Sequence, residues 1–510
     1  MALNLFGGKV DHPMADLKQA QQRVAELPAD PAKALQEISE LLDSIVHTDG
    51  FKLDRQFESI DLLDGAAKNH QRKLAQDYLA MPRQQKFHEN RLWTAVYGLW
   101  KHLGDAYIHC VHGHEANLGG ASAIRKNMPV IVARAIRTLT LQLKWVLLRY
   151  SLPETRIWAD LARLYKLAED KGYATGTVAI YPGSHGSGTV QQEFLKAMML
   201  WASSTDGLPP VRQEIAERAV AHFASSFRLS ATPEGCTHCF NMADPKAPAR
   251  LFKDAASQPG MRFFGAGEAR AALERMSAQI RERGAIPSDV NLGGNYEKDV
   301  VLGVLKHLAM QWSDNAPVRS SERRHTAGRI TVVPGMNDIF GVLDPASTDE
   351  LDFSQEQAAP SAESWIVVNV SEGGYGAIIP PQKSDWIKVG TLVGVQSEVE
   401  KHWGIGVIRR ITRDEHQQRR VGIQLLTRSA IPIKIAKSGG SASDLQPAIL
   451  LSTSPDKQGE VGVVLRHGLF NGRDSLDMAV KNKGYLLMPS SIVEDGEDFD
   501  WAKYKVMQRG

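Results

Sequence analysis

Apolar residues recur at helical spacing through roughly the first 312 positions of the chain. Asp30 followed by Pro31 is typical of an N-cap with proline at the first helical position. The apolar face of the helix that follows comprises Leu35, Ile38, Leu42 and Ile45. Further helices are predicted after Pro210, over residues 269–283 with Gly284 as the stop, and over residues 301–312. This part is therefore predicted to be helical, as a solenoid-like or irregular bundle.

The pattern changes after Trp312 to short β-rich runs separated by Gly, Pro, Asp and Ser clusters, which favours a small antiparallel barrel. These runs are residues 330–333, 365–368, 376–379, 391–395, 406–408 and 421–426. A second β-rich stretch follows from Lys434, and it either completes the barrel or forms one of its own. The predicted fold is multidomain α + β: a helical domain over 1–312, a β-barrel over 313–433 and a β-rich extension over 434–510. The acidic segment between Asp344 and Glu363 has no basic residue and is predicted to be a mobile loop.

Composition and charge narrow the function classes. Of the 510 residues 43% are hydrophobic and 23% are charged, as in ordinary globular proteins, and the net charge is +2. A chain with so small a charge has no global basic field, so we expect no nucleic-acid polymer as a partner. Any anion site must then be local.

Three further features predict a cytoplasmic protein without a membrane span. The three cysteines, an odd number, cannot build a disulfide framework and favour a reducing compartment. The N-terminal residues lack the pattern of a signal peptide. The most apolar stretch, from Val130 to Leu152, is interrupted by charged residues and is predicted to be a buried helix.

Two motifs in the β-rich region carry the candidate chemistry. The first is an arginine cluster just before the first strand, with RxxxR spacing between Arg319 and Arg323 and two more arginines at Arg324 and Arg329. The second directly follows a strand and fits [D/N]xSxxG. Its residues are Asn369, Ser371, Gly373 and Gly374.

Together with the later hairpin, GVIRRI followed by VGIQLL, these motifs resemble the PilZ family over roughly Pro317 to Thr427. The resemblance implies a PilZ-like barrel that binds cyclic di-GMP. It assigns phosphate and guanine contacts to Arg319 and Arg323, guanine contacts to Asn369 and Ser371, and the shape of the turn to Gly374. The interval between the motifs is longer than expected, so Arg324 and Arg329 remain alternative ligand contacts.

The chemistry of these residue types agrees with that resemblance. A cyclic dinucleotide presents two phosphates and the O6 and N7 acceptors of guanine, and the arginine fork matches both. Asn369 and Ser371 supply short donors and acceptors for a base edge. Gly373 and Gly374 are expected to let the turn reach positive φ and to bring backbone N–H groups close to the ligand.

Other candidate sites have simpler explanations. Cys236 and Cys239 have CxxC spacing, but no second pair completes a zinc site, and a plain turn is expected. The histidines over residues 109–114 are expected at a helix end, and the glycines over 183–188 in a connecting loop.

No catalytic motif is visible, so we predict a receptor and not an enzyme. We expect no cofactor or metal beyond the ligand cyclic di-GMP, and a protein partner that binds through the helical region. The alternative is a degenerate PilZ-like scaffold that acts through protein contacts without a ligand. An enzyme hidden in the helical region ranks third.

Overall fold

The computed structural model describes residues 12–81, 86–183, 186–251, 258–315, 324–344, 362–380, 386–400, 402–414, 418–439, 445–480 and 483–508. The chain divides into two compact units. Unit 1 comprises Met1–Arg149, Pro153–Thr205 and Pro210–Pro317. Unit 2 comprises Val318–Gly510 with two short segments, Tyr150–Leu152 and Asp206–Pro209. The multidomain α + β fold predicted from the sequence is confirmed.

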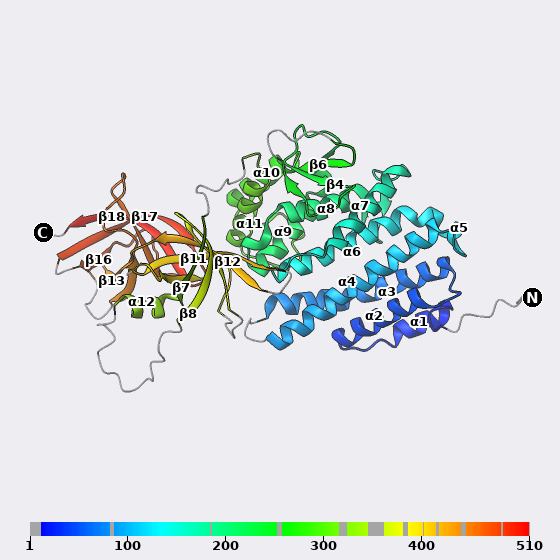
Figure 1. The fold of residues 1–510 in the computed structure, drawn as a ribbon, viewed down its shortest axis with the longest axis horizontal. Coiled ribbons are helices and arrows are strands. Elements are labelled where there is room, and N and C mark those ends of the chain that lie inside the picture. Colours follow the sequence, from blue (N-terminus) through cyan, green and yellow to red (C-terminus); the bar gives the residue numbers. More distant parts are fainter. Residues whose placement is uncertain are drawn as a thin grey trace, which may run out of the picture. The chain divides into compact units, whose positions relative to one another are not determined.

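Unit 1 is built mainly from helices, drawn from blue to green in Figure 1. Their bounds are α1 Leu17–Ala25, α2 Pro31–His47, α3 Leu53–Ala80, α4 Lys86–Glu115, α5 Ala121–Ile124, α6 Met128–Leu148, α7 Thr155–Asp170, α8 Val190–Ala202, α9 Pro210–His222, α10 Ala269–Arg283 and α11 Lys298–Gln311. The Asp30 carboxylate accepts from the Lys33 amide at 2.9 Å and caps α2, as expected. Gly284 ends α10 with φ +70°.

The charged residues that interrupt the apolar stretch of α6 are paired inside unit 1. Arg134 contacts the Asp61 carboxylate and the Tyr107 hydroxyl, and Lys144 lies 2.6 Å from Glu214. These pairs explain how a helix with buried cations packs among its neighbours. Among the described residues, no helix is long and apolar enough to span a membrane.

Unit 1 also contains two small sheets that the periodicity did not predict. A two-stranded hairpin joins α7 to α8 and consists of β1 Val178–Ala179 and β2 Ser187–Gly188. A four-stranded antiparallel sheet lies between α9 and α10 in the chain and has the order β3-β6-β4-β5. Its strands are β3 Arg228–Ser230, β4 His238–Asn241, β5 Ala249–Arg250 and β6 Met261–Gly265.

Unit 2 contains two closed six-stranded barrels (Figure 1). The first barrel comprises β7 Arg324–Pro334, β8 Glu363–Ser371, β9 Gly374–Ile378, β10 Leu392–Ser397, β11 Gly404–Arg413 and β12 Arg419–Thr427. The second barrel comprises β13 Ile431–Lys437, β14 Gln446–Leu450, β15 Glu460–Arg466, β16 Leu476–Val480, β17 Lys483–Asp495 and β18 Phe499–Gln508. The β-rich extension therefore forms a barrel of its own, one of the two outcomes left open above.

The two barrels share one strand order. Around the first barrel the strands run β7-β8-β9-β12-β11-β10, and around the second β13-β14-β15-β18-β17-β16. Numbered within each barrel, both follow the cyclic order 1-2-3-6-5-4, and every pairing is antiparallel. The second barrel is a topological copy of the first.

Each barrel has its own core, and a third apolar cluster joins them. Trp365 and Ile423 lie in the core of the first barrel, and Val463 and Tyr504 in that of the second. The joining cluster includes Leu392, Val407, Ile449 and Phe499, together with residues of helix α12 Met336–Leu343. This cluster covers the outer side of β10 and β11.

Helix α12 accounts for part of the long interval between the two motifs. It follows β7 directly, and its apolar residues Met336 and Ile339 are buried in the joining cluster. The sequence did not predict it. The acidic segment predicted as a loop lies largely outside the described residues.

Candidate functional site

The register of β7 and β8 brings the end of the arginine cluster beside the second motif. Arg324 lies opposite Val370, and His325 lies opposite Asn369. The two motifs are 45 positions apart at Arg324 and Asn369, yet they meet on neighbouring strands. Arg319 and Arg323 lie outside the described residues.

A β-bulge sets the direction of the polar residues in β8. The register of β8 and β9 shifts between Val367 and Asn369, so one extra residue enters β8 there. Val367 packs in the barrel core, and after the bulge the residue packed against that core is Val370. Because neighbours on a strand point to opposite faces, Asn369 and Ser371 lie on the outer face.

Glycines are required where Asn369 and the turn lie close to other backbone. A Cβ at Gly376 would lie 2.5 Å from the Asn369 amide oxygen, so the amide rests over this glycine. Gly374 has φ +153°, and a Cβ there would lie 1.9 Å from the Ile423 carbonyl oxygen. The expectation of positive φ holds for Gly374 but is wrong for Gly373. Gly373 instead accepts a hydrogen bond from the Leu425 amide at 2.9 Å, which fixes the turn from the opposite side.

One cross-strand row defines the outer face of this side of the barrel. It runs through five strands, each residue opposite the next, and comprises His325, Asn369, Gly376, Gly422 and Arg410. The Asn369 amide lies over Gly376, and a Cβ at Gly422 would lie 3.5 Å from the Cβ atom of Arg410, whose guanidinium pairs with Asp206. The two glycines therefore let the Asn369 amide and the Arg410 side chain lie close to the backbone of the barrel wall.

Arg428 is a cation at this site that the motifs did not reveal. Its guanidinium donates to the carbonyl oxygens of Ser371 and Glu372 at 3.2 and 3.3 Å, and it pairs with Glu400 at 3.1 Å. Burial and the Glu400 charge raise the pKa of Tyr375, which lies in the same group. Arg428 therefore holds the turn that carries the second motif. It has no motif spacing, so only the three-dimensional structure could identify it.

Arg324 and Arg329 differ in their surroundings. Both are exposed, and Arg324 is the first residue of β7. The Arg329 guanidinium donates to the Ser364 hydroxyl at 2.8 Å, and its backbone N–H to Glu398 at 3.3 Å. Of these two arginines, Arg324 lies beside the second motif, whereas Arg329 lies farther along the barrel wall.

The CxxC pair of unit 1 does not have the features of an activated or metal-binding pair. Burial raises the pKa of both Cys236 and Cys239, so their thiolates are disfavoured. Between them, His238 is buried against Phe264, and its pKa is lowered to about 4 by burial and the Arg250 charge. Cys236 closes a turn with Pro233, and Cys239 lies in β4.

The histidines over residues 109–114 lie in the last turns of α4, as expected. The glycine segment over 183–188 contributes β2 to a hairpin, so it is only in part the loop that we expected. An open hollow in unit 1 is lined by Tyr165, Glu169 and Arg262 among others. Two of its charged groups pair with each other, because the Arg262 guanidinium donates to both carboxylate oxygens of Glu169 at 3.0 and 2.6 Å.

Comparison with protein families defines the class of this protein as PilZ-domain receptors of cyclic di-GMP. Residues 18–234 match the model described as "Cyclic-di-GMP receptor FimW, N-terminal domain", and residues 342–432 match "Cyclic-di-GMP receptor FimW, middle PilZ domain". Together the two matches cover more than half of the chain, which therefore belongs to the FimW family of cyclic di-GMP receptors. No curated protein matches the chain.

The two matches cover only part of the β-rich region. The middle match includes Asn369, Ser371 and Gly374, while the arginine cluster and the second barrel lie outside both matches, apart from the first two residues of β13. The family is one of receptors and not an enzyme family. The resemblance to PilZ proteins seen in the sequence is confirmed.

Proposed function

We propose that the first barrel binds cyclic di-GMP on the outer face of β8 and β9, with the arginine cluster closing over the ligand. The register that sets Arg324 opposite Val370 and His325 opposite Asn369 carries this proposal. It supports a single site built from two motifs that are distant in the sequence. In this site Asn369 and Ser371 contact a guanine edge, and Gly374 keeps the turn open to backbone contacts.

Because the ligand is negatively charged, we expect the arginines to have a different role from Asn369 and Ser371. Cyclic di-GMP carries two phosphates, and an arginine binds phosphate or a guanine edge through two parallel N–H donors. We assign this task to Arg319 and Arg323, with Arg324 as the described cation beside the second motif. We assign Arg428 to the support of the turn and not to the ligand, because its guanidinium already binds Glu400 and two carbonyl oxygens.

The response to the ligand is proposed to pass to a protein partner through helical unit 1. A ligand shifts a conformational equilibrium only by the difference in its affinity for the two states. Ordering of the arginine cluster around cyclic di-GMP would supply that difference. The cytoplasmic location predicted from the sequence belongs to the same proposal.

A scaffold without a ligand is the second candidate function. The second barrel favours it, because this barrel closes with the same strand order and carries neither the RxxxR nor the NxSxxG motif. The fold itself therefore does not require the ligand motifs. Binding measurements separate the two candidates.

Isothermal titration calorimetry of the full chain with cyclic di-GMP tests the proposal. The parent is expected to bind saturably, and Asn369→Ala combined with Arg323→Ala to weaken binding by at least about twentyfold. Arg473→Ala is the matched control, because Arg473 is exposed in the second barrel. Absence of binding by the folded parent would favour the scaffold. Equal binding by parent and double variant would show that the site lies elsewhere.

A further inference from the structure

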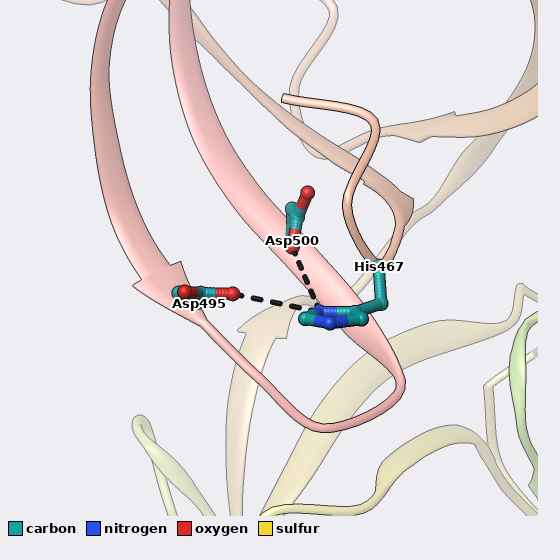
Figure 2. A group of neighbouring side chains, drawn as sticks. All are labelled: His467, Asp495 and Asp500. Carbon is teal, nitrogen blue, oxygen red and sulfur yellow. Dashed lines mark ion pairs between the residues drawn. The ribbon is translucent and has the colours of Figure 1, made fainter. Parts of the chain in front are cut away.

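Three potential metal ligands meet at one end of the second barrel, in a part of the chain that neither family match covers. His467 follows β15 directly, Asp495 ends β17, and Asp500 is the second residue of β18. Figure 2 shows the imidazole of His467 facing both carboxylates. One ligand atom from each of the three residues lies within 4.8 Å of the other two.

The two carboxylates are placed together by the hairpin itself. Asp495 and Asp500 lie opposite each other in the register of β17 and β18. Like charges directly opposite on neighbouring strands are destabilising, so a positive charge between these two carboxylates would stabilise the hairpin. Five of the seven residues from 494 to 500 are acidic. Among the described residues, the ion-pair partner of Asp495 and of Asp500 is His467, and no lysine or arginine forms an ion pair with either.

Asp500 is buried and incompletely satisfied. Its side chain is 3% exposed, and its Oδ1 atom has no hydrogen-bond partner among the described residues. The other oxygen accepts from the Phe470 amide at 3.0 Å, which fixes the carboxylate and directs Oδ1 toward His467. A buried carboxylate oxygen without a donor is costly, and a cation is the partner that suits it best.

One histidine cannot satisfy both carboxylates. Nδ1 of His467 lies 3.5 Å from Asp495 Oδ1 and 3.4 Å from Asp500 Oδ1. A single Nδ1–H can point to only one of these oxygens. In a tetrahedral site with bonds of about 2.1 Å, neighbouring ligand atoms are separated by about 3.4 Å. The two N–O separations match that geometry, and the two carboxylate oxygens lie within 4.8 Å of each other.

We propose that His467, Asp495 and Asp500 bind a divalent transition-metal ion, with Zn²⁺ as the best fit. An imidazole with two carboxylates is a donor set for Zn²⁺ and its neighbours, whereas Mg²⁺ and Ca²⁺ prefer oxygen ligands alone. The hydrogen bond from the Phe470 amide orients the Asp500 carboxylate, as hydrogen bonds to ligating carboxylates do in known metal sites. The ion would join the end of β15 to the β17–β18 hairpin and neutralise its acidic tip. This site is independent of nucleotide binding.

Calorimetry with ZnCl₂ tests the site in the full chain. The background carries Cys236→Ser and Cys239→Ser, which removes the thiols, and the protein is first treated with a chelator. His467→Gln and Asp495→Asn are each expected to lose one bound Zn²⁺ or to weaken it by at least about a hundredfold. Both residues are exposed, so both variants should fold. Glu497→Gln, in the same hairpin, is the control and should bind as the background does.

Thermal unfolding provides a second readout. Zn²⁺ should raise the unfolding temperature of the background and of Glu497→Gln, because an ion that binds only the folded state stabilises it. It should not do so for His467→Gln or Asp495→Asn. Equal stoichiometry and affinity in all four proteins, or an equal thermal shift, would overturn the proposal and leave the cluster as an ion-paired imidazole.

Discussion

The two barrels of unit 2 share a strand order but differ in what covers the third residue of their third strand. In the first barrel this residue is Gly376, and the Asn369 amide lies over it. In the second barrel it is Gly462, where a Cβ would lie 3.1 Å from Leu451 and 3.2 Å from Trp501. In the first barrel a polar amide covers this glycine, and in the second barrel large side chains lie beside it. Closure of the barrel and capacity for a ligand are thus separate properties.

The hairpins between the fifth and sixth strands differ in charge. The last paired residues are Arg413 and Arg419 in the first barrel, and Asp495 and Asp500 in the second. The first hairpin also contains Asp414 and Glu415, so residues 413–419 have no formal net charge, whereas five of the seven residues from 494 to 500 are acidic. The same topology is therefore used with a neutral hairpin in one barrel and an acidic hairpin in the other.

Substitution of the turn glycines should give the largest difference between the barrels. Gly374→Ala places a Cβ against the Ile423 carbonyl at φ +153°, and we expect a loss of about 3 kcal/mol or more in local stability. Gly459→Ala, before the third strand of the second barrel, meets open space at φ +78° and should cost about 1 kcal/mol. Hydrogen exchange of β9 and β15 amides in each variant measures both. Equal losses would contradict the role given to the close approach at Gly374.

Removal of an arginine should have the next largest effect. Hydrogen bonds to charged groups contribute about 1.5–3 kcal/mol, so Arg323→Ala should weaken cyclic di-GMP binding by roughly ten- to a hundredfold. Its remaining affinity should depend less on salt. Arg319→Ala should behave in the same way. A larger loss for Arg324→Ala or Arg329→Ala, measured by calorimetry, would show that the register of the motif is shifted toward β7.

Asn369→Ala and Gly376→Ala should have similar, smaller effects for different reasons. Asn369→Ala removes the amide. Gly376→Ala adds a Cβ that would lie 2.5 Å from the Asn369 amide oxygen, so the amide must move. Each should weaken binding by about 0.5–1.5 kcal/mol, the contribution of a neutral hydrogen bond. Both should reduce discrimination between guanine and adenine dinucleotides, because base-edge contacts specify the base. Competition binding with cyclic di-AMP measures this, and unchanged discrimination in both variants would remove Asn369 from the site.

Arg428→Gln should have the smallest effect. This residue positions the turn through the carbonyl oxygens of Ser371 and Glu372 and is not assigned to the ligand, and the Leu425 amide still holds the turn at Gly373. We expect a loss of affinity of a few fold and faster hydrogen exchange in the β8–β9 turn. A loss as large as that of Arg323→Ala would show instead that Arg428 binds phosphate directly.

The sequence predicted the regular elements of the fold and missed those that depend on tertiary contacts. All six β-rich runs of the first barrel lie within or overlap its strands, because they are apolar runs between turn residues. The sheet of β3 to β6 was missed because its strands have two to five residues. Helix α12 was missed because Met336 and Ile339 pack against residues that are distant in the sequence.

The candidate site was predictable only as far as its motifs reach. RxxxR and NxSxxG are local patterns, so the sequence was enough to identify Arg323 and Asn369 as candidates. Arg428 and Gly376 act through contacts made by strand pairing, and no spacing identifies them. The outward direction of Asn369 depends on the bulge after Val367, which the alternation of residues does not reveal.

Hydrogen–deuterium exchange of the full chain, with and without saturating cyclic di-GMP, tests most directly the claim that only the first barrel holds the ligand. We expect slower exchange in peptides covering residues 319–329 and 369–376. We expect no change in the equivalent peptides of the second barrel, residues 446–466. Protection confined to the second barrel, or equal in both, would contradict that claim.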